Sequence, residues 1–587
     1  MDSKGVSSSF LHDFNACKLM NVSLSSPFKA IHTCLGSVHR LPLLLLSAVR
    51  TRLNTQFGHL DASQLILGSF AVYAGAHCLY VILSPPTDES HTAFYKRRAF
   101  QLMLRLPIIG EKAQAEIAEA KQSIHSGLMK VFKDSTFLTE LPNQSMSNEQ
   151  VLQLLRSYEK LGHVDWQAGR VSGAVYLELT SPQNSHLRLM SEIFQETAYS
   201  NPLHADVFPG IRKMESEIVA MCLKLFQSGP NGVGSVTSGG TESLLLACKA
   251  YRDYARYERG IRRPVILVPH TAHAGFDKAA QLLNIRIVHV PLKRKTMHVD
   301  VQQMRRLINR NVCLLVASAP AYPHGVFDPV QEIAALGQQF NIPVHVDSCL
   351  GGFLLPFAAD AGFQVPAMDF RVRGVTSISA DTHKYGYAPK GTSVLMFSEP
   401  KYRHYQYFVV SEWPGGIYAT GTVAGSRAGS SIATCWAAML SVGREGYVRA
   451  TREILTAARE LRIRLKEVPG IFIYGQPRLS VIAVGSDKFN IIHLSDRLGE
   501  RGWSLNPLQR PPGFHICLTR MHVQPQVLDQ LVQDVKELSE EMSRDPHCKP
   551  TAGSQAAVYG MAQSVPDISL MNEFANHYLD AYYSVKV

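Results

Sequence analysis

The sequence of 587 residues lacks paired cysteines, internal repeats and long low-complexity stretches. Its 10 cysteines are widely scattered and form no C-x-x-C pair, so neither a disulfide framework nor a metal site is expected. Charged residues make up only 18% of the chain, against 46% apolar residues. This balance excludes a disordered, collagenous or coiled-coil architecture and provides apolar material for a large core.

A positive charge excess is present but small. The 59 Lys and Arg residues against 48 Asp and Glu residues give a net charge of +11. Spread over this length, the excess suits a protein near an anionic surface or ligand, and gives no argument for nucleic acid by itself. No nucleic-acid partner is therefore expected.

One apolar run, Leu65–Leu83, carries no Asp, Glu, Lys or Arg, and Pro85 follows it closely. As a helix with about 1.5 Å rise per residue it spans roughly 28 Å, close to a bilayer core. The run predicts a transmembrane helix. One alternative is that this run is a buried helix of a soluble protein. Another is that the acid-poor first 60 residues are a mitochondrial transit peptide. Basic residues after the run, Lys96 to Arg98, place its carboxyl side in the cytosol.

From about residue 150 the pattern is that of an α/β enzyme. Short β-rich runs alternate with segments of helical apolar spacing, which indicates a large, mostly parallel sheet with helices on both faces. A long helix from Gly446 opens a smaller α+β unit towards the carboxyl end. The expected strands of the large sheet are 264–268, 285–290, 313–317, 343–346, 377–380 and 393–397, and those of the smaller unit are 471–474, 480–484 and 514–518.

Two polar side chains follow predicted strands in the second half of the large unit. Lys384 comes in the turn Asp381-Thr-His383-Lys384, and Asp347 ends the run Pro343-Val-His-Val. A lysine at the carboxyl edge of a parallel sheet projects into a crevice, where desolvation lowers its pKa and favours imine formation. Asp347 is suited to keep a pyridinium nitrogen protonated, although in isolation it is equally a helix-capping residue.

Two further motifs precede these in the chain. The turn Ser238-Gly239-Gly240-Thr241 opens a helix, whose free N–H groups and positive end suit an anion. His273 follows the run Val-Ile-Leu-Val-Pro and can cover a planar ring. The alternative is a histidine with a purely structural role. Phosphate site, ring cover, carboxylate and lysine together are the four contacts that pyridoxal 5'-phosphate (PLP) needs.

The order and the residues of these motifs resemble those of the fold-type I PLP enzymes. Within that group they resemble the group II decarboxylase branch, and most of all the sphingosine-1-phosphate lyase family. The resemblance runs from about residue 90 to the end, and Ser379-Ala-Asp-Thr-His-Lys-Tyr-Gly-Tyr-Ala-Pro-Lys-Gly391 is its most specific part. The other segments that carry it are 171–176, 201–219, 236–255, 345–357 and 415–429.

The resemblance implies a role for each matching residue. Lys384 would bind the cofactor covalently, His273 would cover its ring and Asp347 would hold its nitrogen. The phosphate would lie among Ser238, Gly239, Gly240, Thr241 and His383, with Gly425 and Ser426 reaching it from a partner subunit of a homodimer. Tyr176 and His204 would assist catalysis with Lys384, and Asn201, Lys390 and Tyr322 would bind substrate.

The resemblance also implies an organisation for the whole chain: an endoplasmic reticulum anchor, a cytosolic catalytic domain and cleavage of phosphorylated sphingoid bases. The expected segments are 1–64 in the lumen, 65–83 in the membrane, 84–150 as a basic connector, 151–215 contributing to the active site and dimer, 216–430 as the large PLP-binding domain, 431–545 as the small domain and 546–587 as a tail.

Two site segments depart from the family pattern. Ser348 stands where the family usually has an alanine near the cofactor ring, and Thr420-Gly421-Thr422 replaces a Ser-Pro-Thr sequence. Two other functions share the same features: a PLP-dependent amino-acid decarboxylase has the same cofactor residues, and a catalytically silent scaffold has the same fold. The intact Lys384, Asp347 and His273 argue against the scaffold.

The predicted topology has a direct test at two glycosylation sequons, Asn21-Val-Ser23 before the apolar run and Asn143-Gln-Ser145 after it. Because the carboxyl side is placed in the cytosol, Asn143 should carry no glycan in cells. A mobility shift after endoglycosidase treatment of wild type and of Asn143→Gln measures this. A glycan that disappears in Asn143→Gln would contradict the cytosolic placement.

Overall fold

The computed structural model describes residues 70–71, 73–75, 94–95, 98–99, 102, 107–133, 135–162, 164–177, 185–545 and 568–585. The chain divides between Pro86 and Thr87 into two units, and the description below concerns the second. The predicted membrane helix Leu65–Leu83 lies outside the described residues, apart from helical residues 70–71 and 73–75. Searching only what is described finds no helix with both the length and the apolar character of a membrane span.

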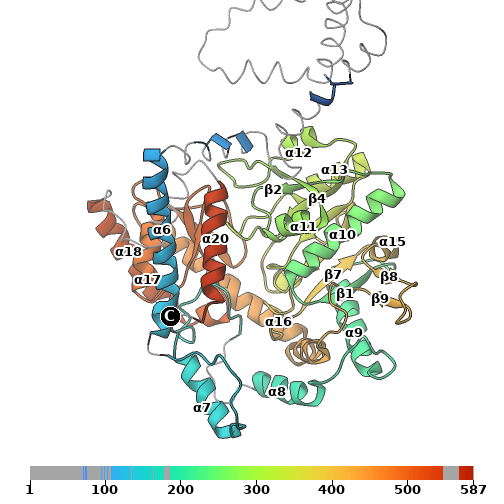
Figure 1. Ribbon diagram of the computed structural model, residues 1–587, viewed down its shortest axis with the longest axis horizontal. Helices are drawn as coiled ribbons and strands as arrows, with labels where there is room; N and C mark the ends of the chain where they lie inside the picture. Colours follow the sequence, from blue (N-terminus) through green and yellow to red (C-terminus); the bar gives the residue numbers. More distant parts are fainter. Residues whose placement is uncertain are drawn as a thin grey trace, which may run out of the picture. The chain divides into compact units, whose positions relative to one another are not determined.

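The large domain is built on a sheet of seven strands in the order β1-β7-β6-β5-β4-β2-β3 (Figure 1). Strands β3, β2, β4, β5 and β6 pair in parallel, and β7 pairs antiparallel with both β6 and β1. The expectation of a mostly parallel sheet is therefore confirmed. The strands are β1 Val233–Thr237, β2 Val265–Pro269, β3 Arg286–Val290, β4 Val312–Ser318, β5 Val344–Asp347, β6 Val375–Ala380 and β7 Ser393–Phe397.

Both faces of this sheet are buried, because successive side chains of a strand point to opposite sides. In β4, Leu315 and Ala317 join one apolar cluster, while Leu314 and Val316 join another. The first cluster includes α9, α13, α14 and α16, and the second includes α10 and α11. The helices of this domain are α9 Pro209–Leu225, α10 Gly240–Glu258, α11 Gly275–Leu283, α12 Val301–Leu307, α13 Val330–Phe340, α14 Leu355–Ala358 and α15 Pro400–His404.

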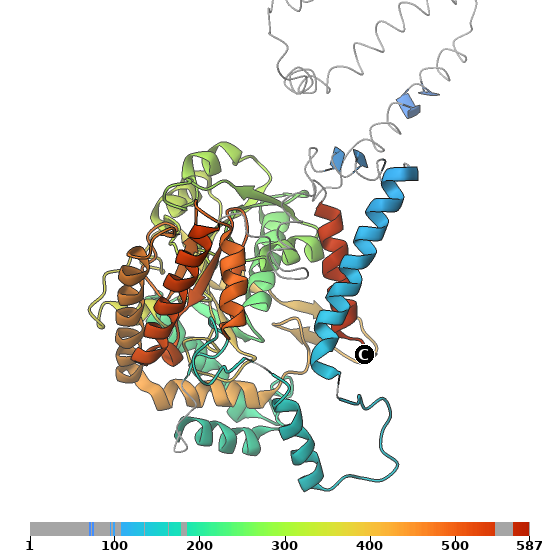
Figure 2. The ribbon, with the colours of Figure 1, turned by 90° about the vertical axis from the view of Figure 1, so that its left-hand side faces the viewer.

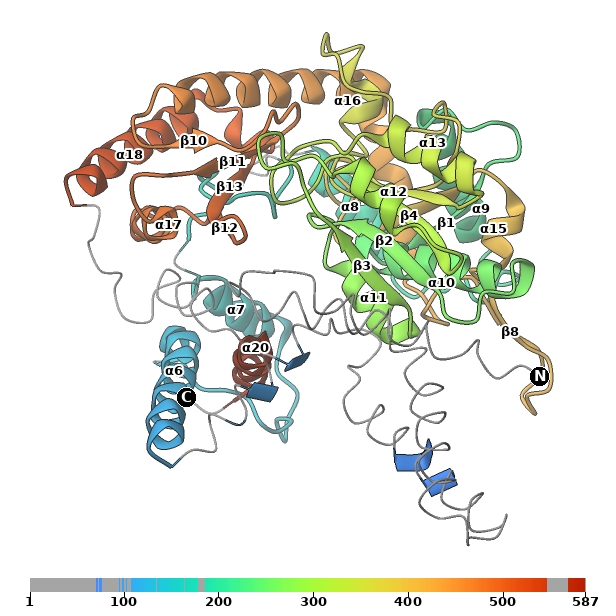
Figure 3. The ribbon, with the colours of Figure 1, turned by 90° about the horizontal axis from the view of Figure 1, so that it is seen from above.

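The small domain is a four-stranded antiparallel sheet in the order β10-β11-β13-β12, covered by helices. Helix α16, Gly429–Lys466, runs along both domains (Figure 3). It consists of two helical segments that meet at a kink at Gly443, whose φ of 60° and ψ of 174° are not helical, so the helix predicted from Gly446 corresponds to the second segment. The other elements are β10 Phe472–Ile473, β11 Val481–Gly485, α17 Ile491–Glu500, β12 Asn506–Leu508, β13 Gly513–Cys517 and α18 Pro525–Arg544.

Segments from the two ends of this unit pack on each other. Helix α6, Pro107–Met129, lies beside α20, Ile568–Tyr582, in both Figure 1 and Figure 2. Lys121 of α6 pairs with Glu573 of α20, and the His577 ring contacts the Lys121 carbonyl at 3.1 Å. The remaining elements are α7 Asn148–Glu159, α8 Ser185–Thr197, the hairpin β8 Phe408–Val410 and β9 Tyr418–Thr420, and the short 3-10 turns Lys130–Phe132 and Arg520–His522.

Candidate active site

Four of the predicted motifs meet at one edge of the large sheet. Strands β1, β2, β5 and β6 run in the same direction, since β1 and β6 are both antiparallel to β7. The carboxyl ends of these strands therefore lead to Ser238, His273, Asp347 and Lys384 at the same side. This edge is where open α/β sheets bind their ligands.

At the centre of this edge Lys384 is paired with a carboxylate three residues before it. The Lys384 Nζ lies 2.9 Å from Asp381 Oδ2, and the Asp381 side chain is only 2% exposed. His383 Nε2 lies 3.7 Å from the same oxygen. Asp381 was not among the predicted site residues, although its place in the Asp-Thr-His-Lys turn was a usable signal.

The pairing reverses the predicted shift of the Lys384 pKa. Burial alone lowers the pKa of the ammonium, as expected, but the attraction of Asp381 outweighs it, so the pKa of Lys384 is raised. Burial likewise raises the pKa of Asp381, and Lys384 and His383 outweigh this effect and lower it. The prediction of a depressed lysine pKa is therefore wrong for the chain without its cofactor.

The turn before α10 has the features of an anion site. No side chain in the described part of the chain caps the amino end of α10, which begins at Gly240. A Cβ at Gly240 would lie 2.9 Å from an Asp381 oxygen and 3.0 Å from Cys349 Sγ, so a side chain there would fill the space. His383 Nδ1 is buried without a hydrogen-bond partner among the described residues and is available as a donor. Thr241 occupies the first turn of α10, and its side chain is exposed.

Of the two residues predicted to hold a cofactor ring, His273 is exposed and Asp347 is buried. The His273 ring is exposed and is fixed by the Gly275 N–H, which donates to His273 Nδ1 at 3.0 Å. The Asp347 side chain is oriented by the Cys349 N–H, which donates to Oδ1 at 3.0 Å. Ser348 is fully buried, and its hydroxyl donates to the Ala319 carbonyl at 3.1 Å.

These features fit PLP. An uncapped helix end, a glycine that leaves space and an unpartnered histidine donor suit its phosphate. The carboxylate of Asp347 suits its ring nitrogen, the ring of His273 suits its face, and Lys384 suits its aldehyde. Nothing in the donor set disagrees with the cofactor that the sequence predicts.

Tyr176, Lys390 and Tyr322 gather beside this group. Lys390 Nζ lies 4.9 Å from the centre of the Tyr176 ring and donates to the His383 carbonyl at 3.4 Å. Desolvation of its ammonium end, followed by repulsion from Lys384, lowers the pKa of Lys390. Burial raises the pKa of the Tyr176 phenol, which stays protonated at neutral pH. Tyr322 packs edge-on against His273, with ring centres 6.1 Å apart.

Asn201 and Ser426 form a second group. Asn201 Nδ2 donates to Ser426 Oγ at 3.1 Å, and its Oδ1 accepts the Arg427 N–H. Within the part of the chain that the structure describes, no contact joins Gly425, Ser426 or the exposed His204 to Lys384. Their assignments to the partner's cofactor and to catalysis stay predictions.

The loop that carries Gly425 and Ser426 is tied to the turn before α10. Glu242 accepts from the Ser238 N–H at 2.6 Å and from the Val423 N–H at 2.8 Å. In the segment that departs from the family pattern, Thr422 Oγ1 donates to the Ala424 carbonyl and Thr420 Oγ1 to the Thr422 carbonyl. These hydroxyl groups support the loop from within.

Sequence reasoning also missed Tyr385 and its partners in the small domain. The Tyr385 hydroxyl is 2.6 Å from both Ser480 Oγ and the Leu518 carbonyl, and hydrogen-bonds to both. Its ring packs edge-on against Tyr176, with centres 4.8 Å apart. Tyr385 therefore fixes the backbone next to Lys384 to the small domain. No sequence signal identifies Ser480 as its partner.

Comparison with known proteins agrees with the geometry. The profile of the pyridoxal-dependent decarboxylase conserved domain matches residues 140–484. A sphingosine-1-phosphate lyase of Drosophila melanogaster is 43% identical over 538 residues, which cover 92% of this chain and 97% of that protein. The chain belongs to the sphingosine-1-phosphate lyase family.

Two other members of the family extend this result. Sphingosine-1-phosphate lyase 1 of Rattus norvegicus is 46% identical over 522 residues, covering 89% of this chain and 90% of that protein. The solved structure of the Burkholderia pseudomallei sphingosine-1-phosphate lyase has a TM-score of 0.68 at 38% identity, and the match covers 70% of this chain and 95% of that one. The fold and the PLP cofactor expected from the sequence are those of this family.

The Asp381–Lys384 pair generates a prediction about cofactor capture. Asp381→Asn removes the negative charge beside Lys384 and keeps the side chain's size, so the pKa of Lys384 falls. Because only the neutral amine attacks an aldehyde, the pH profile of PLP capture by the cofactor-free protein should shift down by roughly 1–3 pH units. The change in PLP absorbance after mixing, followed at a series of pH values, measures the rate.

The matched control for this experiment is Asp369→Asn. Asp369 is also a buried carboxylate, and it pairs with Arg371 at 2.7 Å instead of with Lys384. Its loss should leave the pH profile of capture unchanged. A profile of Asp381→Asn that coincides with wild type would show that Asp381 does not control the lysine.

Proposed function

We propose that this protein cleaves sphingosine 1-phosphate and related phosphorylated sphingoid bases into phosphoethanolamine and a long-chain aldehyde. The observation that carries the proposal is the second lysine, Lys390, held over Tyr176 beside Lys384. A cation at this position suits a substrate phosphate, which an amino acid lacks. The names and the extent of similarity of the family members support the same substrate class.

The chain's own residues provide the setting for this reaction. Bound PLP supplies an electron sink for the carbanion formed when the bond between C2 and C3 breaks. Asp347 would keep the ring nitrogen protonated, His273 would cover one face of the ring, and Lys384 would hold the aldehyde. Lys390 holds the phosphate, which positions the C3 hydroxyl group in the crevice.

Proton transfer involves groups whose pKa values are shifted. Because burial raises the pKa of Tyr176, its phenol holds a proton at neutral pH and is better suited to donate one at C2 than to remove one at C3. Lys384 lies next to Asp381, whose carboxylate would stabilise the positive charge when the lysine accepts a proton. His204 is a further predicted participant.

The active unit is a membrane-bound homodimer in this proposal. Gly425 and Ser426 reach the cofactor phosphate of the partner subunit, and the apolar run Leu65–Leu83 anchors the chain in the endoplasmic reticulum with the catalytic domain in the cytosol. The family resemblance and the charge pattern around the run support this arrangement. Anchoring would keep the enzyme with a substrate that partitions into the bilayer.

The deciding experiment is a product assay with the purified full-length, PLP-loaded protein. After incubation with sphingosine 1-phosphate, mass spectrometry should detect phosphoethanolamine and the matching long-chain aldehyde. Lys384→Ala should give neither product, and Lys536→Ala, which changes an exposed lysine on α18, should give both. Carbon dioxide release from amino acids, with no cleavage of the lipid, would establish the decarboxylase instead.

Lys390→Ala separates the substrate phosphate from the cofactor phosphate. Losing one charge-assisted hydrogen bond costs about 1.5–3 kcal/mol, so KM for sphingosine 1-phosphate should rise roughly 10- to 100-fold. The Kd of PLP, measured by fluorescence, should change little. An equal loss of affinity for both would assign Lys390 to the cofactor and remove the main argument for a phosphorylated substrate.

A further inference from the structure

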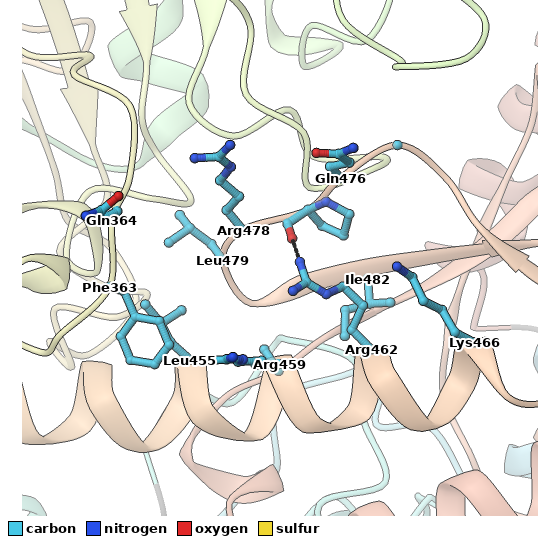
Figure 4. Close-up of a pocket in the computed structure, with 13 residues that line it drawn as sticks. Phe363, Gln364, Leu455, Arg459, Arg462, Lys466, Gln476, Arg478, Leu479 and Ile482 are labelled. Atoms are coloured by element: carbon cyan, nitrogen blue, oxygen red, sulfur yellow. Dashed lines mark hydrogen bonds between the residues drawn. The ribbon is translucent and has the colours of Figure 1, made fainter.

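A concave site lies at the seam between the large and small domains. The pocket has a volume of about 450 Å³ and shares no residue with the Lys384 site. Phe363 and Gln364 of the large domain form one side, and the small domain forms the rest (Figure 4). Leu455, Leu479 and Ile482 also line it, but each is at most 3% exposed.

Of the residues that the structure describes, four with positive side chains line this pocket and none with an acidic side chain does. Arg459, Arg462 and Lys466 follow each other at spacings of three and four along α16 and therefore share one face of that helix. Arg478 comes from the loop before β11, on the opposite side of the pocket (Figure 4). The cations thus surround the space from two separate elements.

The positive charge in this pocket is uncompensated, and this sets it apart from its surroundings. Elsewhere in the small domain, Arg464 pairs with Asp529, Arg497 with Glu541 and Arg501 with Asp534. Throughout the described residues, by contrast, none of the four pocket cations forms an ion pair; Arg462 donates only to the Pro477 carbonyl, at 2.6 Å. An anion in the pocket would therefore meet several cations that have no ion-pair partner among the described residues.

We propose that this pocket is a regulatory site for a small phosphorylated molecule. Guanidinium groups present paired donors that match phosphate oxygens, and three of the four cations are arginines. The half-buried Phe363 ring would contact the carbon part of the ligand. The phosphate ester is the shared chemistry of a soluble metabolite and of a lipid headgroup.

A short structural path connects this pocket with the active site. Arg478 and Leu479 directly precede Ser480, whose hydroxyl group is hydrogen-bonded to Tyr385. Tyr385 follows Lys384 in the chain and packs on Tyr176. A ligand that holds Phe363 and Arg478 together would also stiffen the seam across which Tyr385 reaches. The site would therefore regulate the reaction proposed above, and the regulatory part rests on that proposed function.

Binding is tested with the PLP-loaded full-length protein and two soluble probes, ATP and pyrophosphate, by titration calorimetry at low salt. The test variant is Arg459→Gln/Arg478→Gln. The matched control is Arg305→Gln/Arg306→Gln, which removes the same charge from two exposed arginines on α12. Wild type and control should bind ATP with equal Kd, and the test variant should bind at least tenfold more weakly.

Two further arms identify the source of the binding. Lys390→Ala should keep the tight ATP binding, since that lysine belongs to the catalytic site; loss of binding there would overturn the proposal. Phosphatidic acid in mixed detergent micelles, compared with phosphatidylcholine alone, tests the lipid headgroup. The site is supported if wild type binds ATP or phosphatidic acid and the test variant does not. The proposal is overturned if wild type and test variant bind equally, or if wild type binds neither ligand.

The coupling to the active site has a readout that needs no turnover. Saturating ATP should slow amide hydrogen exchange in β11, Val481–Gly485, and in the segment around Tyr385 at least severalfold, in wild type and control but not in the test variant. Exchange that slows only near α16 would overturn the regulatory part. If wild type fails to cleave the lipid, the binding arms still decide whether the pocket holds phosphate.

Discussion

The Asp381 carboxylate is almost completely withdrawn from solvent, and a buried charge is costly unless an opposite charge lies beside it. Lys384 and His383 lie against Asp381 Oδ2, whereas Oδ1 has no hydrogen-bond partner among the described residues. The carboxylate also lies next to Gly240, so the turn after β6 packs against the turn after β1. The position of the reactive lysine is thus set by the needs of a carboxylate before any cofactor binds.

The same constraint connects the two domains. Tyr385 stands next to Lys384 and hydrogen-bonds to Ser480 and Leu518 of the small domain. The lysine is consequently fixed on one side by charge and on the other by a phenol that reaches across the seam. Burial of Tyr176 against this phenol extends the arrangement to the substrate side of the crevice. A change in the pairing of the domains would therefore move the residues that act on the substrate.

Much of the large sheet could be predicted because its strands are short apolar runs that end in polar turns. The predicted strand 393–397 is identical with β7, and 285–290 differs from β3 by one residue. Strand β1 was missed because Val233–Thr237 contains a glycine and hydroxyl residues, and its strand character comes from pairing with β7. The sheet order and Ser480 depend on contacts between distant segments, which local patterns do not encode.

The candidate site was predictable as a set of motifs but not as an electrostatic arrangement. Lys384, Asp347, His273 and the turn before α10 each have a local signal, and parallel strands bring them to one edge. The predicted direction of the Lys384 pKa shift was wrong because it considered desolvation alone and left out Asp381, three residues before the lysine. Opposing effects of this kind are settled only by a distance, here 2.9 Å.

Ser348 shows how a departure from a family pattern can be chemically silent. Its added hydroxyl group already has a partner in the Ala319 carbonyl, so the residue brings no unsatisfied polar atom into the interior. A serine and an alanine are then nearly equivalent at this position in the folded protein. The residue at this position therefore says little about whether a member of the family is active. The presence of the charged pair Asp381 and Lys384 says much more.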